Sequence, residues 1–199
     1  GNCAACHTTP GGEPYAGGLS FRTDFGTIYS TNITQDPETG IGNWTEEQFD
    51  RALRKGIGAD GSYLYPAFPY PSFTKIVDED VSALYAYFKT LPAVEAPNKE
   101  NEMSFPFNQR WLMGAWNMLF FDEGAFQTEP DKSDAWNRGA YLVEGLGHCS
   151  ACHTPRNVLG GPVMSKSQGG GLYVDKVPTG HYRDWSAPNL TSAASGLQH

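Results

Sequence analysis

One short pattern occurs twice in this chain, as Cys3-Ala4-Ala5-Cys6-His7 and as Cys149-Ser150-Ala151-Cys152-His153. Residues three apart share a face of a helix, so each copy presents two thiols side by side with an imidazole next to them. C-x-x-C-H is the pattern at which haem c is attached. The two thiols bind the haem vinyl groups and the His binds iron. The sequence therefore predicts two covalent haem c groups, held by Cys3, Cys6, Cys149 and Cys152, with His7 and His153 as proximal iron ligands.

Two other uses of paired cysteines fit less well. Four thiolates can form a zinc site, but the two pairs lie far apart in the sequence, and zinc does not explain a His after each second Cys. A redox dithiol of the thioredoxin type belongs in a βαβ pattern, which this sequence does not show. The two motifs use all four cysteines, so covalent haem remains the prediction.

The composition suits small, loop-rich domains that complete their core with a cofactor. Of the 199 residues, 39% are apolar and 13% aromatic, and there are 23 glycines and 14 prolines. The formal net charge is −8. Nucleic-acid binding needs a basic surface, so nucleic acid is excluded as a partner.

The ends of the sequence carry an expectation of their own. No apolar run approaches the ~18 residues of a membrane-spanning helix, and no signal peptide is present. Because haem c is attached outside the bacterial cytoplasm, we expect a signal that was removed or left out. The chain starts two residues before Cys3 and ends abruptly at Ala193–His199. This predicts a first module without its N-terminal helix and a second module without its C-terminal half.

Helical periodicity is clearest between Trp44 and Lys55. Thr45 and Gln48 fit a capping box at its start, and Gly56 suits the position after its end. The apolar stripe that would face the core consists of Phe49, Ala52 and Leu53.

Three further helices are predicted. One begins with Asp78 as N-cap and stops at Leu91, with Val81, Leu84, Tyr85 and Phe88 on one face. A second, Asn108 to Phe121, is apolar over much of its circumference and is expected to be buried against protein. A third runs from Trp136 to Leu146 into the second motif. Residues 93–101 and 122–134 are interpreted as polar linkers, and residues 21–29 as extended chain.

The loop after the first motif contains Pro10 and Pro14. In haem proteins a backbone carbonyl commonly accepts the N–H of the proximal imidazole. Either proline could supply or shape that carbonyl here; a plain turn is the alternative.

A weak internal repeat supports two related modules. Asn32-Ile33-Thr34 in the first half matches Asn189-Leu190-Thr191 in the second, with roughly 11 extra residues within 155–186 in the second copy. We predict a first module at 1–92, a linker with the aromatic helix at 93–133, and part of a second module at 134–199.

Several stretches together resemble a known family. They are Asn32–Gly42, Tyr65–Tyr70, Asp78–Phe88, Phe105–Arg110 and Cys152–Asn157. The chain is similar to the multihaem cytochrome c subunits of bacterial membrane-bound dehydrogenases that oxidise alcohols, aldehydes, gluconate, sorbitol or fructose. The resemblance implies a mainly α fold of tandem small class I c-type cytochrome modules, with long irregular loops wrapped around haem. The family usually carries three haem c groups, of which this chain would hold two.

The resemblance also implies a function. Such a subunit performs no bond chemistry; it passes electrons from a catalytic dehydrogenase subunit, sometimes with a small iron–sulfur subunit, to membrane ubiquinone. It works on the periplasmic side of the inner membrane, attached through parts outside this chain or through partners. The stretch Phe107–Met113 looks most like partners of molybdopterin aldehyde dehydrogenases. Partners of quinoprotein alcohol dehydrogenases and of flavin polyol or gluconate dehydrogenases are alternatives, and a dihaem peroxidase-like enzyme is an alternative of another class.

The sixth iron ligand of the first haem departs from the usual pattern. Small c-type modules place a Met-Pro pair in the loop before their last helix, whereas this chain has Phe68-Pro69. We predict Met113 as the ligand, with Met103 or Met118 as further candidates and an open or otherwise filled site as the alternative. Met164 follows His153 too closely to fill the equivalent position in the second module.

Two residues beside the second motif have roles of their own. Arg156 is predicted as a haem propionate partner, with a solvated arginine as the alternative. His148 precedes Cys149 and points elsewhere on the helix than His153, so a surface or packing role is expected.

Overall fold

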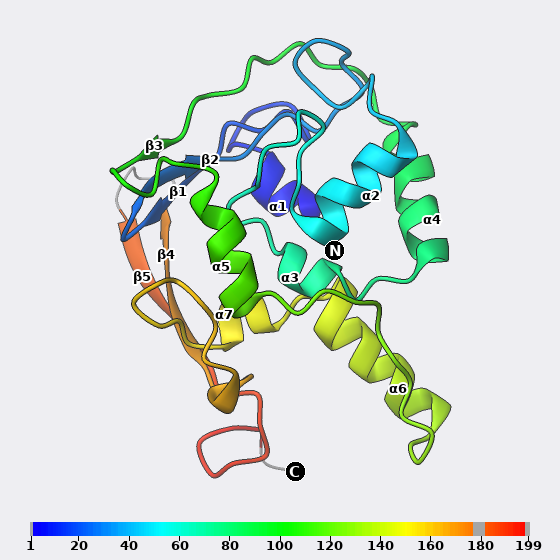
Figure 1. The fold of residues 1–199 in the computed structure, drawn as a ribbon, viewed down its shortest axis with the longest axis vertical. Helices are drawn as coiled ribbons and strands as arrows, with labels where there is room; N and C mark the ends of the chain where they lie inside the picture. The colour runs from blue at the N-terminus through cyan, green and yellow to red at the C-terminus, as the bar shows by residue number, and fades with distance from the viewer. Residues whose placement is uncertain (1, 177–181, 198–199) are drawn as a thin grey trace.

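The computed structural model describes residues 2–176 and 182–197. Within them the chain is helical, with a three-stranded antiparallel sheet, β1-β2-β3, and a two-stranded one, β4-β5 (Figure 1). The prediction of a mainly helical fold with long irregular segments agrees with this architecture. The division into tandem class I modules stays a prediction.

The elements follow one another in two groups. The first group comprises α1 (Cys3–His7), β1 (Ser20–Thr23), β2 (Gly26–Tyr29), α2 (Glu46–Lys55), α3 (Tyr70–Phe73), α4 (Asp78–Phe88), β3 (Glu102–Met103) and α5 (Leu112–Phe120). The second comprises α6 (Asp134–Tyr141), the π-helical turn η1 (Leu142–Leu146), α7 (Ser150–His153), the 3₁₀ turn η2 (Met164–Lys166), β4 (Gly171–Lys176) and β5 (Tyr182–Ala187).

Helix α2 forms as its sequence predicts. The Thr45 side chain accepts from the backbone N–H of Gln48, and the Gln48 side chain accepts from that of Thr45, which completes the capping box. Gly56 ends the helix in the left-handed conformation at φ 65°. The predicted stripe of Phe49, Ala52 and Leu53 is buried.

Helix α4 packs on α2 across the main core. This core consists of Ile41, Phe49, Leu53, Phe73, Ile76, Val81 and Phe88. One detail of the prediction was wrong: Asp78 is the first helical residue and Val77 the N-cap. The Asp78 carboxylate instead accepts from Arg54 at 2.6 Å, which joins the start of α4 to α2.

The segment interpreted as a linker at 93–101 is bound to the first half of the chain. The Asn32 amide donates to the Val94 carbonyl at 2.7 Å, and the Asn98 side chain accepts from the Asn32 backbone at 2.7 Å. Asn101 accepts from the Tyr29 backbone at 2.8 Å, and β3 then pairs with β2. The segment is polar because its amides satisfy buried backbone groups, and its role as a linker between two modules stays a prediction.

Helix α5 is shorter and less buried than predicted. It begins at Leu112, and only Met113 and Trp116 are buried. They pack with Tyr65 and Tyr70 in a second cluster. The opposite face is open, because Met118 is 89% exposed and Leu119 68% exposed. The expected burial against protein is therefore present on the side of Met113 and Trp116 only.

The second predicted linker, 122–134, also contacts the first half. The Phe126 N–H donates to the Lys75 carbonyl at 3.0 Å, and the Gly124 N–H donates to the Thr74 hydroxyl at 3.0 Å. Helix α6 then starts at Ser133 as N-cap and continues into η1, so the predicted helical run to Leu146 is present.

Candidate haem attachment sites

Each C-x-x-C-H motif forms a short helix whose His is held by a backbone carbonyl. The Nδ1 of His7 hydrogen-bonds the Thr31 carbonyl oxygen at 2.7 Å, and the Nδ1 of His153 hydrogen-bonds that of Pro188 at 2.7 Å. This bond fixes the neutral tautomer and leaves Nε2 for a metal. Neither Pro10 nor Pro14 supplies this carbonyl, since the acceptor comes from far along the chain, which leaves the plain turn as the alternative for their loop.

The same hydrogen-bonded frame surrounds both histidines. The His7 carbonyl accepts from the Gly17 N–H, and the His153 carbonyl accepts from the Gly170 N–H, both at 2.8 Å. The residue after each His is a Thr whose hydroxyl also accepts a backbone N–H at 3.1 Å. For Thr8 the donor is Tyr15, and for Thr154 it is Gln168.

The repeated Asn-x-Thr stretch has a clear place in this frame. It follows directly after the acceptor carbonyl in both copies. The Asn32 side chain accepts from the Thr34 N–H at 2.9 Å, and the Asn189 side chain accepts from the Thr191 N–H at 2.8 Å. Each bond closes a local turn that orients the preceding carbonyl.

The extra length of the second copy lies between residues of the frame. His153 and Gly170 are 17 positions apart, against 10 for His7 and Gly17, and Gly170 and Pro188 are 18 positions apart, against 14 for Gly17 and Thr31. In each copy an antiparallel hairpin, β1-β2 or β4-β5, then leads back to the acceptor carbonyl. Strands β1 and β4 contact each other, so the two hairpins lie side by side (Figure 1).

Burial favours the neutral forms of three groups in the motifs, His7, Cys3 and Cys152. Burial lowers the pKa of His7. Burial also raises the pKa of the Cys3 and Cys152 thiols. None of the four cysteines forms a disulfide in the described part of the chain. Thiols on one helical face, beside a neutral imidazole with Nε2 available, fit covalent haem c.

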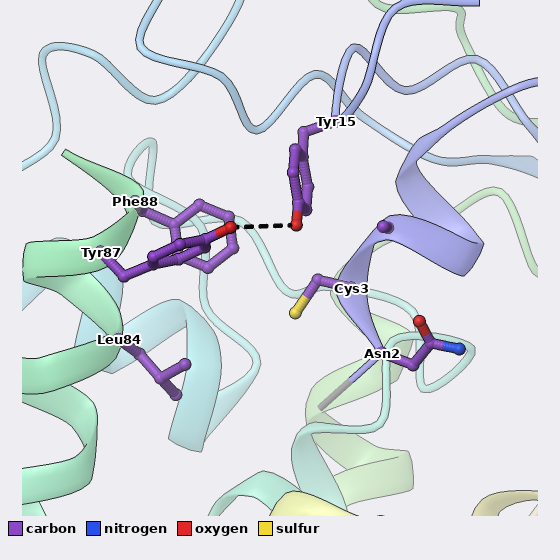
Figure 2. Close-up of a pocket in the computed structure, with 7 residues that line it drawn as sticks. Asn2, Cys3, Tyr15, Leu84, Tyr87 and Phe88 are labelled. Carbon is purple, nitrogen blue, oxygen red and sulfur yellow. Dashed lines mark hydrogen bonds between the residues drawn. The ribbon is translucent and has the colours of Figure 1, made fainter. Parts of the chain in front are cut away.

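A small pocket lies beside the first attachment thiol. It is lined by Asn2, Cys3 and Ala4 at α1, by Leu84, Tyr87 and Phe88 of α4, and by Tyr15. Figure 2 shows the Cys3 sulfur between α1 and α4, below the hydroxyl pair of Tyr15 and Tyr87, which are 3.4 Å apart. The pocket therefore lies between α1 and α4.

The candidates for the sixth ligand differ in their surroundings. Phe68 is half-buried and packs against both core clusters. Met113 is buried in the second cluster, and the half-buried Met103 packs against it. Met118 points to solvent. Met113 as ligand stays a prediction, and it shares a cluster with the Phe68 that fills the usual methionine position.

Arg156 and His148 flank the second motif and have different surroundings. The Arg156 guanidinium donates to the Gly160 carbonyl at 3.0 Å, and no carboxylate pairs with it in the described residues. Desolvation lowers the pKa of Arg156, beside Cys152. Its role as a propionate partner stays a prediction. The His148 ring meets Phe73 edge-on at 5.3 Å, which is the packing role expected for it.

The frame around each histidine was not predicted from the sequence. Gly17, Gly170 and the carbonyls of Thr31 and Pro188 each act through backbone atoms, which leave little trace in residue type. The available signal was the Asn-x-Thr repeat, because each copy begins one residue after an acceptor carbonyl.

Comparison with known proteins agrees with this chemistry. The family model for cytochrome c matches residues 1–92. The chain is 53% identical over 192 residues to a nicotinate dehydrogenase subunit of Pseudomonas putida, covering 96% of this chain and 16% of that protein. It is 49% identical over 161 residues to the gluconate 2-dehydrogenase cytochrome c subunit of Pantoea cypripedii, covering 79% and 36%.

A third relative is covered over most of its length. The chain is 40% identical over 205 residues to a dihaem c-type cytochrome of Cereibacter sphaeroides, covering 98% of this chain and 69% of that protein. The two dehydrogenase subunits are much longer than the matched region. Within residues 2–176 and 182–197, no helix has the length and apolar character needed to cross a membrane.

Proposed function

The chain belongs to the cytochrome c family, and we propose that it is an electron-transfer subunit of a bacterial dehydrogenase complex, with two covalent haem c groups. The duplicated frame around His7 and His153 carries the proposal. Two histidines, each beside a C-x-x-C pair, are oriented by carbonyl acceptors at the same 2.7 Å distance. A single zinc or dithiol site would not require this duplication.

At each site the cysteines and the histidine have different roles. Cys3 and Cys6 attach the first haem c, and Cys149 and Cys152 attach the second. Haem c supplies an iron that accepts and releases one electron. The bond from Nδ1 to a backbone carbonyl holds each imidazole in one tautomer and makes its Nε2 a stronger donor.

The partners are proposed from the relatives. Cytochrome subunits of gluconate, alcohol and fructose dehydrogenases are among the proteins similar to this chain, and so is a nicotinate dehydrogenase subunit. A catalytic dehydrogenase subunit is therefore the proposed electron donor and membrane quinone the proposed acceptor. The proposal that the catalytic partner oxidises aldehydes, with or without an iron–sulfur subunit, is supported by sequence resemblance alone.

The proposed location is the periplasmic side of the inner membrane. Haem c is attached outside the bacterial cytoplasm, and the proposed donor and acceptor would meet there. Membrane attachment is assigned to partners or to parts of the protein outside this chain.

The test is to produce the chain in bacteria that attach haem c, together with the catalytic subunit that copurifies from the source membrane. Denaturing electrophoresis with haem staining should show covalent haem, and Cys149→Ala with Cys152→Ala should halve the haem content per chain. Addition of the dehydrogenase substrate should then reduce both haems before added quinone reoxidises them. Haem that acid–acetone extracts, or haem that substrate cannot reduce in the assembled complex, would refute the proposal. Rapid peroxide turnover by the isolated chain would favour the peroxidase-like alternative.

A further inference from the structure

The second motif touches the first half of the chain at helix α3. The ring of Phe73 lies 5.3 Å from that of His148, at an interplanar angle of 78°. One residue earlier on α3, the Ser72 hydroxyl lies 3.2 Å from the Ser150 hydroxyl of α7. His148 is covalently next to Cys149, so this contact reaches the second attachment site directly.

The other side of Phe73 reaches toward the first motif. Phe73 is buried in the main core, and Cys3 and Phe68 both pack against that core. The rings of Phe68 and Phe73 are 5.5 Å apart. Packed protein therefore connects the first attachment site to Phe73, and Phe73 to the second site.

The chain holds this junction rigidly. Leu146 of η1 packs against the same core. The hydroxyl of Tyr141, at the end of α6, donates to Asp80 at 2.5 Å. His148 has a positive φ of 40°, which a non-glycine residue keeps only where its surroundings impose it. The contact of Phe73 with His148 is separate from the hydrogen bonds that hold His7 and His153.

We propose that electrons pass between the two haem c groups of this chain across the contact of Phe73 with His148. The inference rests on the proposed function, because it requires both haems. One haem iron loses one electron and the other gains it, and no bond or proton changes place. Electron tunnelling weakens steeply with empty space between groups, so a packed ring contact between the sites carries electrons better than a gap.

The variants separate the contact from general packing. His148→Leu removes the ring at a half-buried position, and His148→Phe keeps an aromatic ring there. Phe73→Leu removes the partner ring. Phe49→Leu is the matched control, because Phe49 is a buried ring of the same core that packs on Tyr85 and Phe88 instead.

The experiment injects one electron photochemically into the oxidised, haem-loaded chain and follows its redistribution by visible absorption. Single-haem variants supply the reference spectra of each haem. His148→Leu and Phe73→Leu should slow the redistribution several-fold, whereas His148→Phe and Phe49→Leu should leave its rate unchanged. The potential of each haem and the urea midpoint of each variant show whether the sites and the fold are intact.

The outcomes distinguish this inference from the function on which it rests. If both His148→Leu and Phe73→Leu leave the redistribution rate unchanged, with both haems attached and reducible, electrons do not pass across the contact of Phe73 with His148. The proposed electron-transfer function is not affected by that result. Equal slowing in Phe49→Leu and Phe73→Leu also overturns the inference about this contact, since the effect would then come from general core packing. Failure of the wild-type chain to hold two reducible haems counts against the proposed function itself.

Discussion

The imidazole of His7 is bonded through Nδ1 to the carbonyl oxygen of Thr31, 24 residues further along the chain, at 2.7 Å. That carbonyl is placed by the hairpin β1-β2 and by the close approach of Gly17 to residues 31 and 32. The imidazole proposed as the proximal ligand is therefore oriented by backbone packing, and glycine is the residue that permits it.

Gly17→Ala should disturb the first haem selectively. At φ 75° an added Cβ costs about 1–2 kcal/mol, and here it would also collide with the backbone of Thr31 and Asn32. A weaker Nδ1 bond makes His7 a poorer donor, so the potential of the first haem should rise. Gly11→Ala is the control, because φ is 74° there and nothing lies within 4 Å of the added Cβ. Equal potentials in the two variants, measured by redox titration, would contradict this explanation.

Met113→Leu tests the sixth ligand of the first haem. The substitution keeps the side-chain volume, so stability should fall by less than about 1.5 kcal/mol. If the thioether binds iron, the sulfur–iron charge-transfer absorption disappears and the potential of the first haem falls. Met118→Leu, on the exposed face of the same helix, should change neither. An unchanged spectrum in Met113→Leu would direct attention to Met103.

Arg156→Gln should lower the potential of the second haem, and the sign follows from charge. A cation close to the haem disfavours the oxidised, more positive state, so its removal lowers the potential; the Coulomb energy depends on distance and local dielectric. We therefore expect a net fall. Arg156→Lys keeps the charge and should give a smaller change, and Arg138→Gln removes an exposed positive charge elsewhere as the control. Equal potentials in Arg156→Gln and the wild-type chain, in a redox titration of the second haem, would show a solvated arginine without a propionate partner.

The open face of α5 should bind another protein. Trp111, Met118 and Leu119 are all at least 68% exposed on or beside one short helix, and grouped exposed apolar side chains commonly mark interfaces. Met118→Lys with Leu119→Lys should weaken copurification with the catalytic subunit while both haem spectra stay unchanged. Val158→Lys, at another exposed apolar position, is the control. Full retention of the partner by the α5 double variant would exclude this face as the interface.

Stability should fall at alkaline pH through Tyr141. Burial, with the bond to Asp80, raises the pKa of Tyr141 from 10.0 to about 12. The unfolded chain releases this proton first, so the contribution of Tyr141 is complete below pH 10 and is lost as the pH rises towards 12. At pH 11, one unit above the pKa of the unfolded tyrosine, the loss is about 1.4 kcal/mol. Urea unfolding at pH 9 and pH 11 should show a smaller loss for Tyr141→Phe than for the wild-type chain. Tyr70, whose pKa burial also raises, supplies part of the remaining loss.

Local patterns predicted local structure well. The capping box of Thr45 and Gln48 and the left-handed Gly56 are present because those side chains act on neighbouring backbone. The packing of the polar stretches after Pro92 and Phe121 against the first half was not predicted. Their Asn side chains and backbone N–H groups bind partners 50 or more residues away, and nothing in the local pattern reveals such contacts.

The site shows the same contrast. The motif predicts Cys3, Cys6 and His7 as site residues from spacing alone, and the short helix α1 places them as that spacing requires. The acceptors Thr31 and Pro188 are backbone carbonyls, and any residue type offers one. The outer face of α5 was misjudged because apolar composition does not say which side of a short helix is covered.

The hydrogen bonds from Asn32 to Val94 and Asn98 matter for the choice of fragments of this protein. The region that matches the cytochrome c family ends at residue 92, just before those two partners. An excision at that boundary would remove two acceptors from the amide and backbone of Asn32, which is 2% exposed. A fragment of the first half that keeps these contacts and the pairing of β2 with β3 therefore extends through β3, past the end of the matched region.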